Sequence, residues 1–196
     1  MKILIVADRE ESYIWDFFDK ERFKDVDLII SCGDLKAEYL SFLVTMINAP
    51  LYYVPGNHDT DYTEHPPEGC VSIDGAMEIY KGVKIAGLGG SPFYCESACQ
   101  YTEKQMKKRV RKLRHIIRKN GGLDILVAHS PAFGINDGED ICHKGFISFI
   151  ELMDEYSPRY FFHGHQHQNY GSNNHRTVRF KNTIIVNAFG YHIIEY

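Results

Sequence analysis

Short apolar runs alternate with segments of helical spacing along most of this chain. The runs are KILIVA (2–7), DLIIS (27–31), LYYVP (51–55) and LDILVAH (123–129). Continuous apolar runs of this length are typical of strands that are covered on both faces, as in a parallel sheet between two other layers. We therefore expect these four segments to be buried strands.

Four segments between the strands carry helix signals. Ser12 is expected to cap a short helix that runs to residue 20, and residues 36–47 space their apolar side chains three and four apart. Residues 102–120 give the clearest helix, because Thr102 and Gln105 form a capping box and two glycines end it. A fourth helix includes residues 148–155 and ends before Pro158.

The remaining segments predict shorter strands. Residues 70–73, 76–80 and 83–88 are rich in β-forming residues and are separated by turn signals. The tail predicts strands at 159–163, 176–180, 183–188 and 191–195, with a loop full of Asn and Gly at 168–174. No repeat or linker is visible, so we predict one α/β domain over residues 1–196, with parallel strands first and a meander last.

Composition excludes several classes of protein. The net charge of −4, from 22 basic and 26 acidic residues, argues against a surface that binds nucleic acid or anionic lipid over its whole extent. No apolar run approaches the roughly 18 residues of a membrane span, so we expect no membrane association. Five scattered cysteines argue against a disulfide framework and favour the reducing cytoplasm.

The helix at 102–119 holds nine of the 22 basic residues. Its apolar side chains form one stripe (Met106, Val110, Leu113 and Ile117), so the charges occupy the outer face of an amphipathic helix. A solvated outer helix explains this pattern, and a docking surface for a polyanion such as nucleic acid is the alternative. The aromatic side chains that would stack on single-stranded bases are absent from the segment.

Polar clusters stand where five of the apolar runs end. They are Asp8, Gly33-Asp34, the GNHD block at 56–59, His129, and the GHQH block at 164–167. Because the carboxyl ends of parallel strands meet at one edge of a sheet, we expect these clusters to converge. Buried charges need partners, and a mixture of carboxylate, amide and imidazole donors suits Mn²⁺, Fe or Zn²⁺ better than Ca²⁺.

In their residues and order, these blocks resemble the calcineurin-like metallophosphoesterase superfamily, whose pattern is D-x-H, G-D, G-N-H-[DE], a lone His after a strand, and G-H-x-H. The match extends from Asp8 to His167. The resemblance implies a four-layer α-β-β-α sandwich, with two mixed β-sheets flanked by helices, and a dinuclear metal centre. It also implies a phosphate-ester substrate and two divalent ions, for which we expect Mn²⁺, with Fe, Zn²⁺ and Mg²⁺ as alternatives.

The resemblance carries roles over to single positions. Asp34 is expected to bridge the two ions. Asp8 and His167 are expected to bind the first ion, and Asn57, His129 and His165 the second. In this family the ions lie about 3.5–4 Å apart and activate a water that attacks phosphorus in line. His58 is expected to act as general acid or to contact the phosphate, with Asp59 orienting it.

The first block departs from the family, because Glu10 stands where the pattern has His. Three hypotheses are open. Glu10 binds the first ion in place of imidazole, or Glu11 binds it instead, or the first metal site is weak or lost. In the first case two divalent ions, three carboxylates and a hydroxide sum to zero charge, where the His version carries +1. We therefore expect monoanionic diesters to be favoured over dianionic monoesters, and Mn²⁺ or Mg²⁺ over Zn²⁺ at the first site.

The sequence thus predicts a metal-dependent phosphoesterase, a hydrolase that favours phosphodiesters. His143, in the polar loop 134–145, is a further candidate for substrate contact. Two alternatives stay open: a binding or scaffold protein that keeps the fold with little catalysis, and a nuclease that uses the basic helix. The motifs carry almost no information on the natural substrate, and none on oligomeric state.

Overall fold

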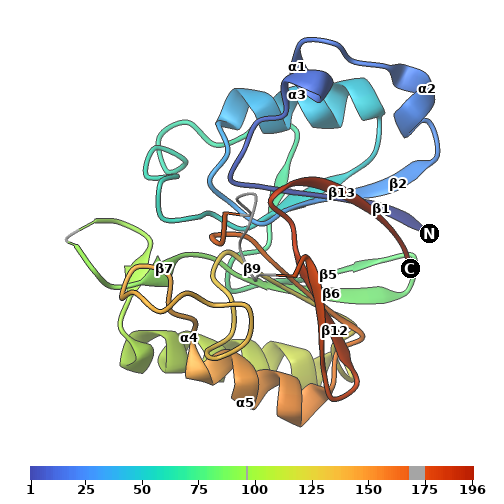
Figure 1. Cartoon of the computed structure of the whole chain (residues 1–196). Coiled ribbons are helices and arrows are strands. Elements are labelled where there is room, and N and C mark those ends of the chain that lie inside the picture. Colours follow the sequence, from blue (N-terminus) through green and yellow to red (C-terminus); the bar gives the residue numbers. More distant parts are fainter. Residues whose placement is uncertain (96, 168–174) are drawn as a thin grey trace.

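The chain forms four layers in the order helix, sheet, sheet, helix (Figure 1). The structure is a computed structural model that describes residues 1–95, 97–167 and 175–196, so the loop expected at 168–174 lies outside the described residues. The architecture confirms the predicted α/β fold class with two mixed sheets between helices.

The first sheet has five strands. Their order is β13 (Gly190–Glu195), β1 (Lys2–Ala7), β2 (Val26–Ser31), β3 (Leu51–Tyr53) and β4 (Val71–Ser72). Strands β1 to β4 run parallel, and β13 runs antiparallel to β1. The carboxyl ends of β1, β2 and β3 therefore lie at one edge, where the first three polar clusters begin.

The second sheet has six strands. Their order is β11 (Thr177–Phe180), β12 (Thr183–Asn187), β10 (Tyr160–His163), β9 (Ile125–Ala128), β6 (Val83–Leu88) and β5 (Met77–Tyr80). The four inner strands run parallel, and the edge strands β11 and β5 run antiparallel to their neighbours. A separate pair, β7 (Ser91–Pro92) and β8 (Gln100–Tyr101), is not among the strands that the sequence predicts.

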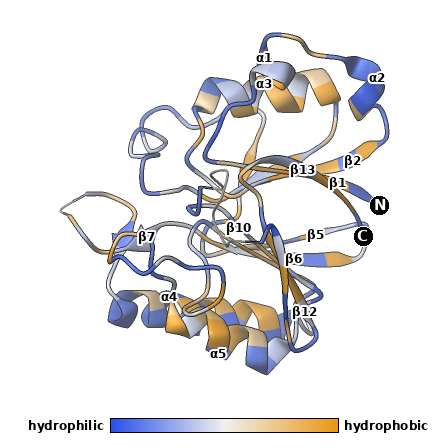
Figure 2. Cartoon of the chain, in the orientation of Figure 1, coloured by the Kyte–Doolittle hydropathy of each residue, from blue (hydrophilic) through white to orange (hydrophobic). Residues whose placement is uncertain are grey.

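Burial on both faces explains why the strands are apolar runs. In β1, Ile5 packs between the sheets with Val127 and Phe162, whereas its neighbour Leu4 packs outward against Leu40 of α3 (Ala37–Ile47). The hydropathy colours show largely apolar strands inside and helices that mix apolar and polar residues (Figure 2).

The helix expected at residues 12–20 is a wrong prediction. The chain instead forms α1 (Ser12–Trp15) and α2 (Lys20–Phe23), which cover the first sheet together with α3. The Asp19 carboxylate accepts the backbone N–H of Glu21 at 3.0 Å. This hydrogen bond caps the start of α2, so the chain begins a second helix where the predicted single helix would have continued.

Helices α4 (Glu103–Lys119) and α5 (Ile147–Tyr156) cover the second sheet. The capping box of Thr102 and Gln105 is confirmed. Several of the basic side chains of α4 are paired with acidic neighbours: Lys107 with Glu151, Arg109 with Asp74, and Arg114 and Arg118 with Glu155. This pairing favours the interpretation of α4 as an outer structural helix.

The prediction that the last strands form one meander is wrong for the final strand. Strands β11 and β12 form an antiparallel hairpin, but β13 leaves the second sheet and pairs with β1 of the first, with Ile5 opposite His192. The crossing begins at Asn187, and Gly190 adopts a left-handed φ of 71° at the start of β13. Alternating apolar residues predict a strand but not the sheet it joins.

Over the described ranges, none of the helices has the length and apolar character needed to cross a membrane.

Candidate metal centre

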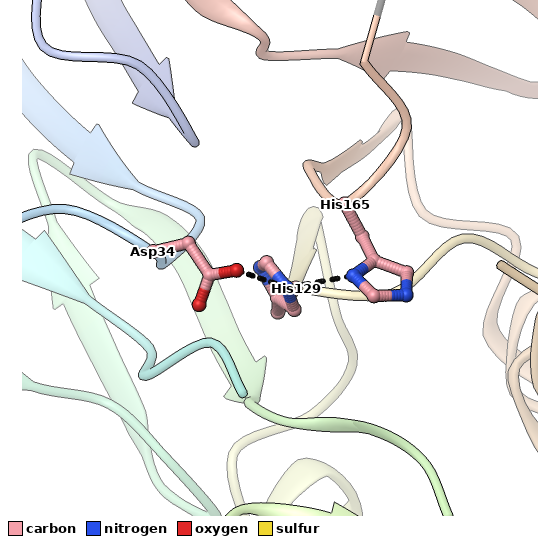
Figure 3. A group of neighbouring side chains, drawn as sticks. All are labelled: Asp34, His129 and His165. Carbon is pink, nitrogen blue, oxygen red and sulfur yellow. Dashed lines mark hydrogen bonds and ion pairs between the residues drawn. The ribbon is translucent and has the colours of Figure 1, made fainter. Parts of the chain in front are cut away.

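Four side chains from both sheets meet at the carboxyl ends of the strands. The Nε2 atom of His129 lies 3.0 Å from Asn57 Oδ1, 3.1 Å from His165 Nδ1 and 3.3 Å from Asp34 Oδ2. Figure 3 shows His129 between Asp34 and His165. Within residues 1–95, 97–167 and 175–196, these three form the one group of acidic, Cys or His side chains with ligand atoms all within 4.8 Å of one another.

Both histidines, in their neutral form, turn an unprotonated nitrogen toward this point. His129 Nδ1 lies 2.8 Å from the carbonyl oxygen of Cys32, and His165 Nε2 lies 2.7 Å from that of Cys142. A carbonyl only accepts hydrogen bonds, so each of these nitrogens carries the proton of the neutral ring and the other nitrogen presents a lone pair. The lone pairs of His129 Nε2 and His165 Nδ1 therefore face each other.

A cation satisfies this arrangement. Two imidazole lone pairs, an amide oxygen and a carboxylate oxygen converge, and with both rings neutral none of the four atoms carries a proton to share. Asn57, His129 and His165 are buried and Asp34 is half-buried, so acceptors without a donor are costly here. The donor set of Asp34, Asn57, His129 and His165 fits a first-row divalent ion.

The pKa directions agree with a need for positive charge. Complete burial lowers the pKa of His129, but the carboxylates of Asp34 and Asp8 outweigh it and raise the pKa to about 9. Burial opposes ionisation of Asp34 as well, yet His129 and the backbone N–H of His58 hold its pKa down at about 2. Burial and the charge of His129 lower the pKa of His165 to about 3. Without metal, a proton on His129 supplies the missing cation.

Three of the predicted ligands occupy the left-handed region of backbone space. The φ angles are 64° at Asp8, 57° at Asp34 and 66° at His165. Non-glycine residues rarely adopt this conformation, and Asp, Asn and His do so more readily than most others. Each residue lies within three positions of the end of a strand. The turn of the backbone at that point therefore directs the side chain toward the centre.

The loops after β2 and β3 approach too closely for a side chain at Gly56. A Cβ atom at this position would lie 2.0 Å from Asp34 Oδ1 and 2.7 Å from Asp34 N. The glycine therefore allows the block at 56–59 to pack directly against Asp34. This contact brings Asn57 to the same point as Asp34.

Asp8 lies at the edge of this group. Both of its carboxylate oxygens accept the backbone N–H of His165, at 2.9 and 3.0 Å, so it ties β1 of the first sheet to the loop after β10 of the second. Burial raises the pKa of Asp8 to about 7, against the lowering effect of His129.

Glu10 faces the same cleft as Asp8, in contact with Lys36. One carboxylate oxygen of Glu10 accepts the backbone N–H of Lys36 at 3.4 Å, and the other lies 3.6 Å from Lys36 Nζ. The cleft has a volume of about 650 Å³, and Asp34 also lines it. The alternative residue, Glu11, accepts hydrogen bonds from Arg9.

His58 and Asp59, the expected catalytic pair, make different contacts. His58 is exposed and lines the cleft, and its backbone N–H donates to Asp34 Oδ1 at 2.8 Å. Asp59 is buried, and its Oδ2 accepts the backbone N–H groups of Asp34 and Gly56, both at 2.7 Å. Asp59 thus ties the loop after β2 to the loop after β3, a role that the sequence does not suggest.

His167 and His143 line a neighbouring cavity of about 280 Å³ together with Asp140. The ring of His167 packs on Phe189 with centroids 5.1 Å apart. His143 contacts both carboxylate oxygens of Asp140 at 2.9 Å, and its ring centroid lies 5.3 Å from that of His165. The structure therefore places His143 beside the centre, and its contact with substrate stays a prediction.

Sequence reasoning missed several groups that shape the centre. The carbonyl groups of Cys32 and Cys142 fix the histidine rings, and no side-chain pattern reveals a carbonyl. The Tyr94 hydroxyl, in the loop between β7 and β8, accepts a hydrogen bond from Asn57 Nδ2 at 3.1 Å. Asn187, at the end of β12, donates from Nδ2 to the carbonyl oxygen of Gln166 at 2.7 Å and so supports the GHQH loop.

Comparison with known proteins gives one family match. A family model described as calcineurin-like phosphoesterase matches residues 1–169. No curated protein sequence matches the chain.

Similar solved structures are remote. A structure described as a novel archaeal phosphodiesterase shows 14% identity and a TM-score of 0.45, over 97% of this chain and 84% of that one. A single-mutant Vps29 from Entamoeba histolytica shows 13% identity and a TM-score of 0.45, over 96% and 73%. Vps29 from Chaetomium thermophilum shows 14% identity and a TM-score of 0.38, over 95% and 70%.

Proposed function

This chain belongs to the calcineurin-like phosphoesterase family, and from that premise we propose that it is a metal-dependent phosphodiesterase that hydrolyses a P–O bond. The observation that carries the proposal is the convergence of four acceptor atoms on one point, with His129 Nε2 and His165 Nδ1 facing each other at 3.1 Å. With both rings neutral, a cation at this point would satisfy all four acceptor atoms at once.

We propose two divalent ions, with Mn²⁺ as the expected metal, of which the converging donors fit one. Asn57, His129 and His165 would hold one ion and Asp8, Glu10 and His167 the other, with Asp34 shared by both. Bound ions of this kind polarise phosphoryl oxygens and activate water as a nucleophile near neutral pH.

The chain itself supplies orientation and a proton donor. The backbone N–H of His58 holds Asp34 Oδ1, which leaves Oδ2 facing His129. The exposed imidazole of His58 lines the cleft, where its protonated form would donate to the leaving oxygen of the ester. His143 would contact the substrate from the adjoining cavity.

Glu10 gives a reason to expect a diester substrate. A third carboxylate beside Asp8 and Asp34 cancels the positive charge that would otherwise attract a dianionic monoester. Lys36 contacts Glu10 and so competes with the first ion for that carboxylate. The two ions should therefore bind with unequal affinity, the ion at His129 and His165 more tightly.

The test combines metal content with turnover. Protein prepared without chelator is analysed for metal per chain, and hydrolysis of bis(p-nitrophenyl) phosphate is measured after Mn²⁺ addition. We expect two ions per chain at saturation and turnover that Asp34→Asn abolishes. Metal binding without turnover under any divalent ion would instead support a binding or scaffold protein, for which the Glu10–Lys36 contact is the favouring observation.

A further inference from the structure

The side-chain amide of Asn57 has to be oriented before it can bind a metal. Only its oxygen is a ligand, so Oδ1 must point to the centre and the Nδ2 group must point away from it. Asn57 is 2% exposed, which leaves no room for bulk water to accept the Nδ2 protons. Another group of the protein must accept a hydrogen bond from Nδ2.

Tyr94 supplies that acceptor. Its hydroxyl oxygen accepts a hydrogen bond from Asn57 Nδ2 at 3.1 Å, while Asn57 Oδ1 lies 3.0 Å from His129 Nε2. If the hydroxyl were absent, the buried N–H group would lose its partner. Nothing would then hold the amide in this orientation. A rotated amide would turn Nδ2, which cannot bind a metal, toward the centre in place of Oδ1.

The position of Tyr94 is fixed from the base of its loop. Gln100, a buried residue of β8, accepts the backbone N–H groups of Tyr94 and Cys95 on its side-chain oxygen, both at 3.1 Å. Its side-chain nitrogen lies 3.3 Å from Cys95 Sγ. The β7–β8 pair, which the sequence does not predict, therefore holds the hydroxyl in place over Asn57.

We propose that Tyr94 is a positioning residue that selects the metal-binding orientation of the Asn57 amide. The proposal rests on the proposed function only in that it requires a divalent ion at Asp34, Asn57, His129 and His165. It concerns metal affinity and needs no catalytic turnover.

The test is a double-mutant cycle read by calorimetric titration with Mn²⁺. Tyr94→Phe removes the acceptor and should weaken binding of the tighter ion by about 10-fold, the lower end of what lost supporting contacts cost at metal sites. Asn57→Asp presents a carboxylate oxygen in either orientation. In that background Tyr94→Phe should change the Mn²⁺ affinity by less than about twofold.

A matched control separates orientation from general damage. Tyr101→Phe removes a hydroxyl from the neighbouring strand β8 and should leave the Mn²⁺ affinity unchanged. The metal-free form of Tyr94→Phe should still give a cooperative melting transition, which would show that the variant folds. A loss of Mn²⁺ affinity in Tyr101→Phe as large as that in Tyr94→Phe would indicate general damage to the loop and would overturn the inference.

The outcomes are distinct. Equal Mn²⁺ affinity in native protein and Tyr94→Phe overturns the inference and leaves the proposed function standing. An equal loss with and without the Asn57→Asp change also overturns it, because the effect would then not pass through the amide. Absence of Mn²⁺ binding by the native protein contradicts the proposed function itself, and the inference with it.

Discussion

The Asp59 carboxylate accepts the backbone N–H of Asp34 at 2.7 Å, and the same oxygen accepts that of Gly56 at 2.7 Å. Two loops that end different strands are therefore joined by one buried atom. Since that atom contacts backbone and not the His58 ring, its structural and catalytic roles can be separated by the choice of variant.

Asp59→Ala should lower the free energy of unfolding by roughly 1–3 kcal/mol, because it leaves two buried N–H groups unpaired. Asp59→Asn keeps an acceptor oxygen and should retain most of the stability. Urea unfolding of both variants measures the difference. If Asp59→Asn is as stable as native protein but has lost turnover, the carboxylate is needed for catalysis, as the sequence suggests.

Metal-free protein should become less stable between pH 7 and pH 9. His129 has its pKa raised from 6.5 to about 9, so the stability from its protonation is complete below pH 6.5 and is lost as pH rises through 9. The expected loss is about 2–3 kcal/mol over this interval. Thermal melting in the presence of chelator measures it, and a flat profile would contradict the assignment.

Asp34→Asn is the companion variant for this pH dependence. Burial opposes the upward shift of the His129 pKa, and the Asp34 carboxylate is the largest of the influences that raise it. Without that charge the pKa should fall toward its ordinary value, so the stability of Asp34→Asn should depend less steeply on pH between 7 and 9.

Mn²⁺ should raise the melting temperature. At about 100 times its Kd, a ligand that binds only the native state adds about 2.7 kcal/mol. For a chain of this size that corresponds to a shift of roughly 5–10 °C. The shift should grow with pH, because the ion displaces the proton of His129. His165→Ala removes one of the four converging ligands and should abolish most of the shift, whereas His115→Ala on the outside of α4 serves as the matched histidine control.

His58→Ala should slow turnover and spare metal binding. A general acid contributes typically 10²–10⁴-fold to rate, and His58 lines the cleft and holds Asp34 through its backbone N–H. Single-turnover rates with bis(p-nitrophenyl) phosphate, alongside Mn²⁺ titration, separate the two effects. Unchanged kcat in His58→Ala would remove the general-acid role.

Glu10→His should shift the substrate preference toward monoesters. The change raises the net charge of the loaded centre from zero to +1, which strengthens attraction for a dianion more than for a monoanion. The kcat/KM ratio for p-nitrophenyl phosphate against its bis ester measures the shift. Lys36→Met is the companion variant, since it frees Glu10 without changing the carboxylates. An unchanged ratio in Glu10→His would remove the charge argument.

Much of the centre can be predicted from sequence, because its residues follow apolar strands whose ends must meet. Asp34, Asn57, His129 and His165 are all identified in this way. The alternation of apolar runs likewise predicts most of the elements of both sheets.

The remainder depends on contacts that leave no local pattern. The pairing of β13 with β1 joins the two ends of the described chain, and the pair β7–β8 has only two residues in each strand. The carbonyl groups that fix the histidine tautomers, and the approach of Lys36 to Glu10, arise from tertiary packing alone. Sequence identifies the ligands but not the groups that orient them.

The left-handed backbone at Asp8, Asp34 and His165 limits which amino acids these positions accept. A screen that selects only for folded protein, with no demand on activity, should still deplete Val, Ile and Thr at these three codons, because β-branched residues fit this conformation worst. Asn and Gly should survive there. Backbone conformation would then limit which residues occur at these three positions, even in homologues that have lost catalytic activity.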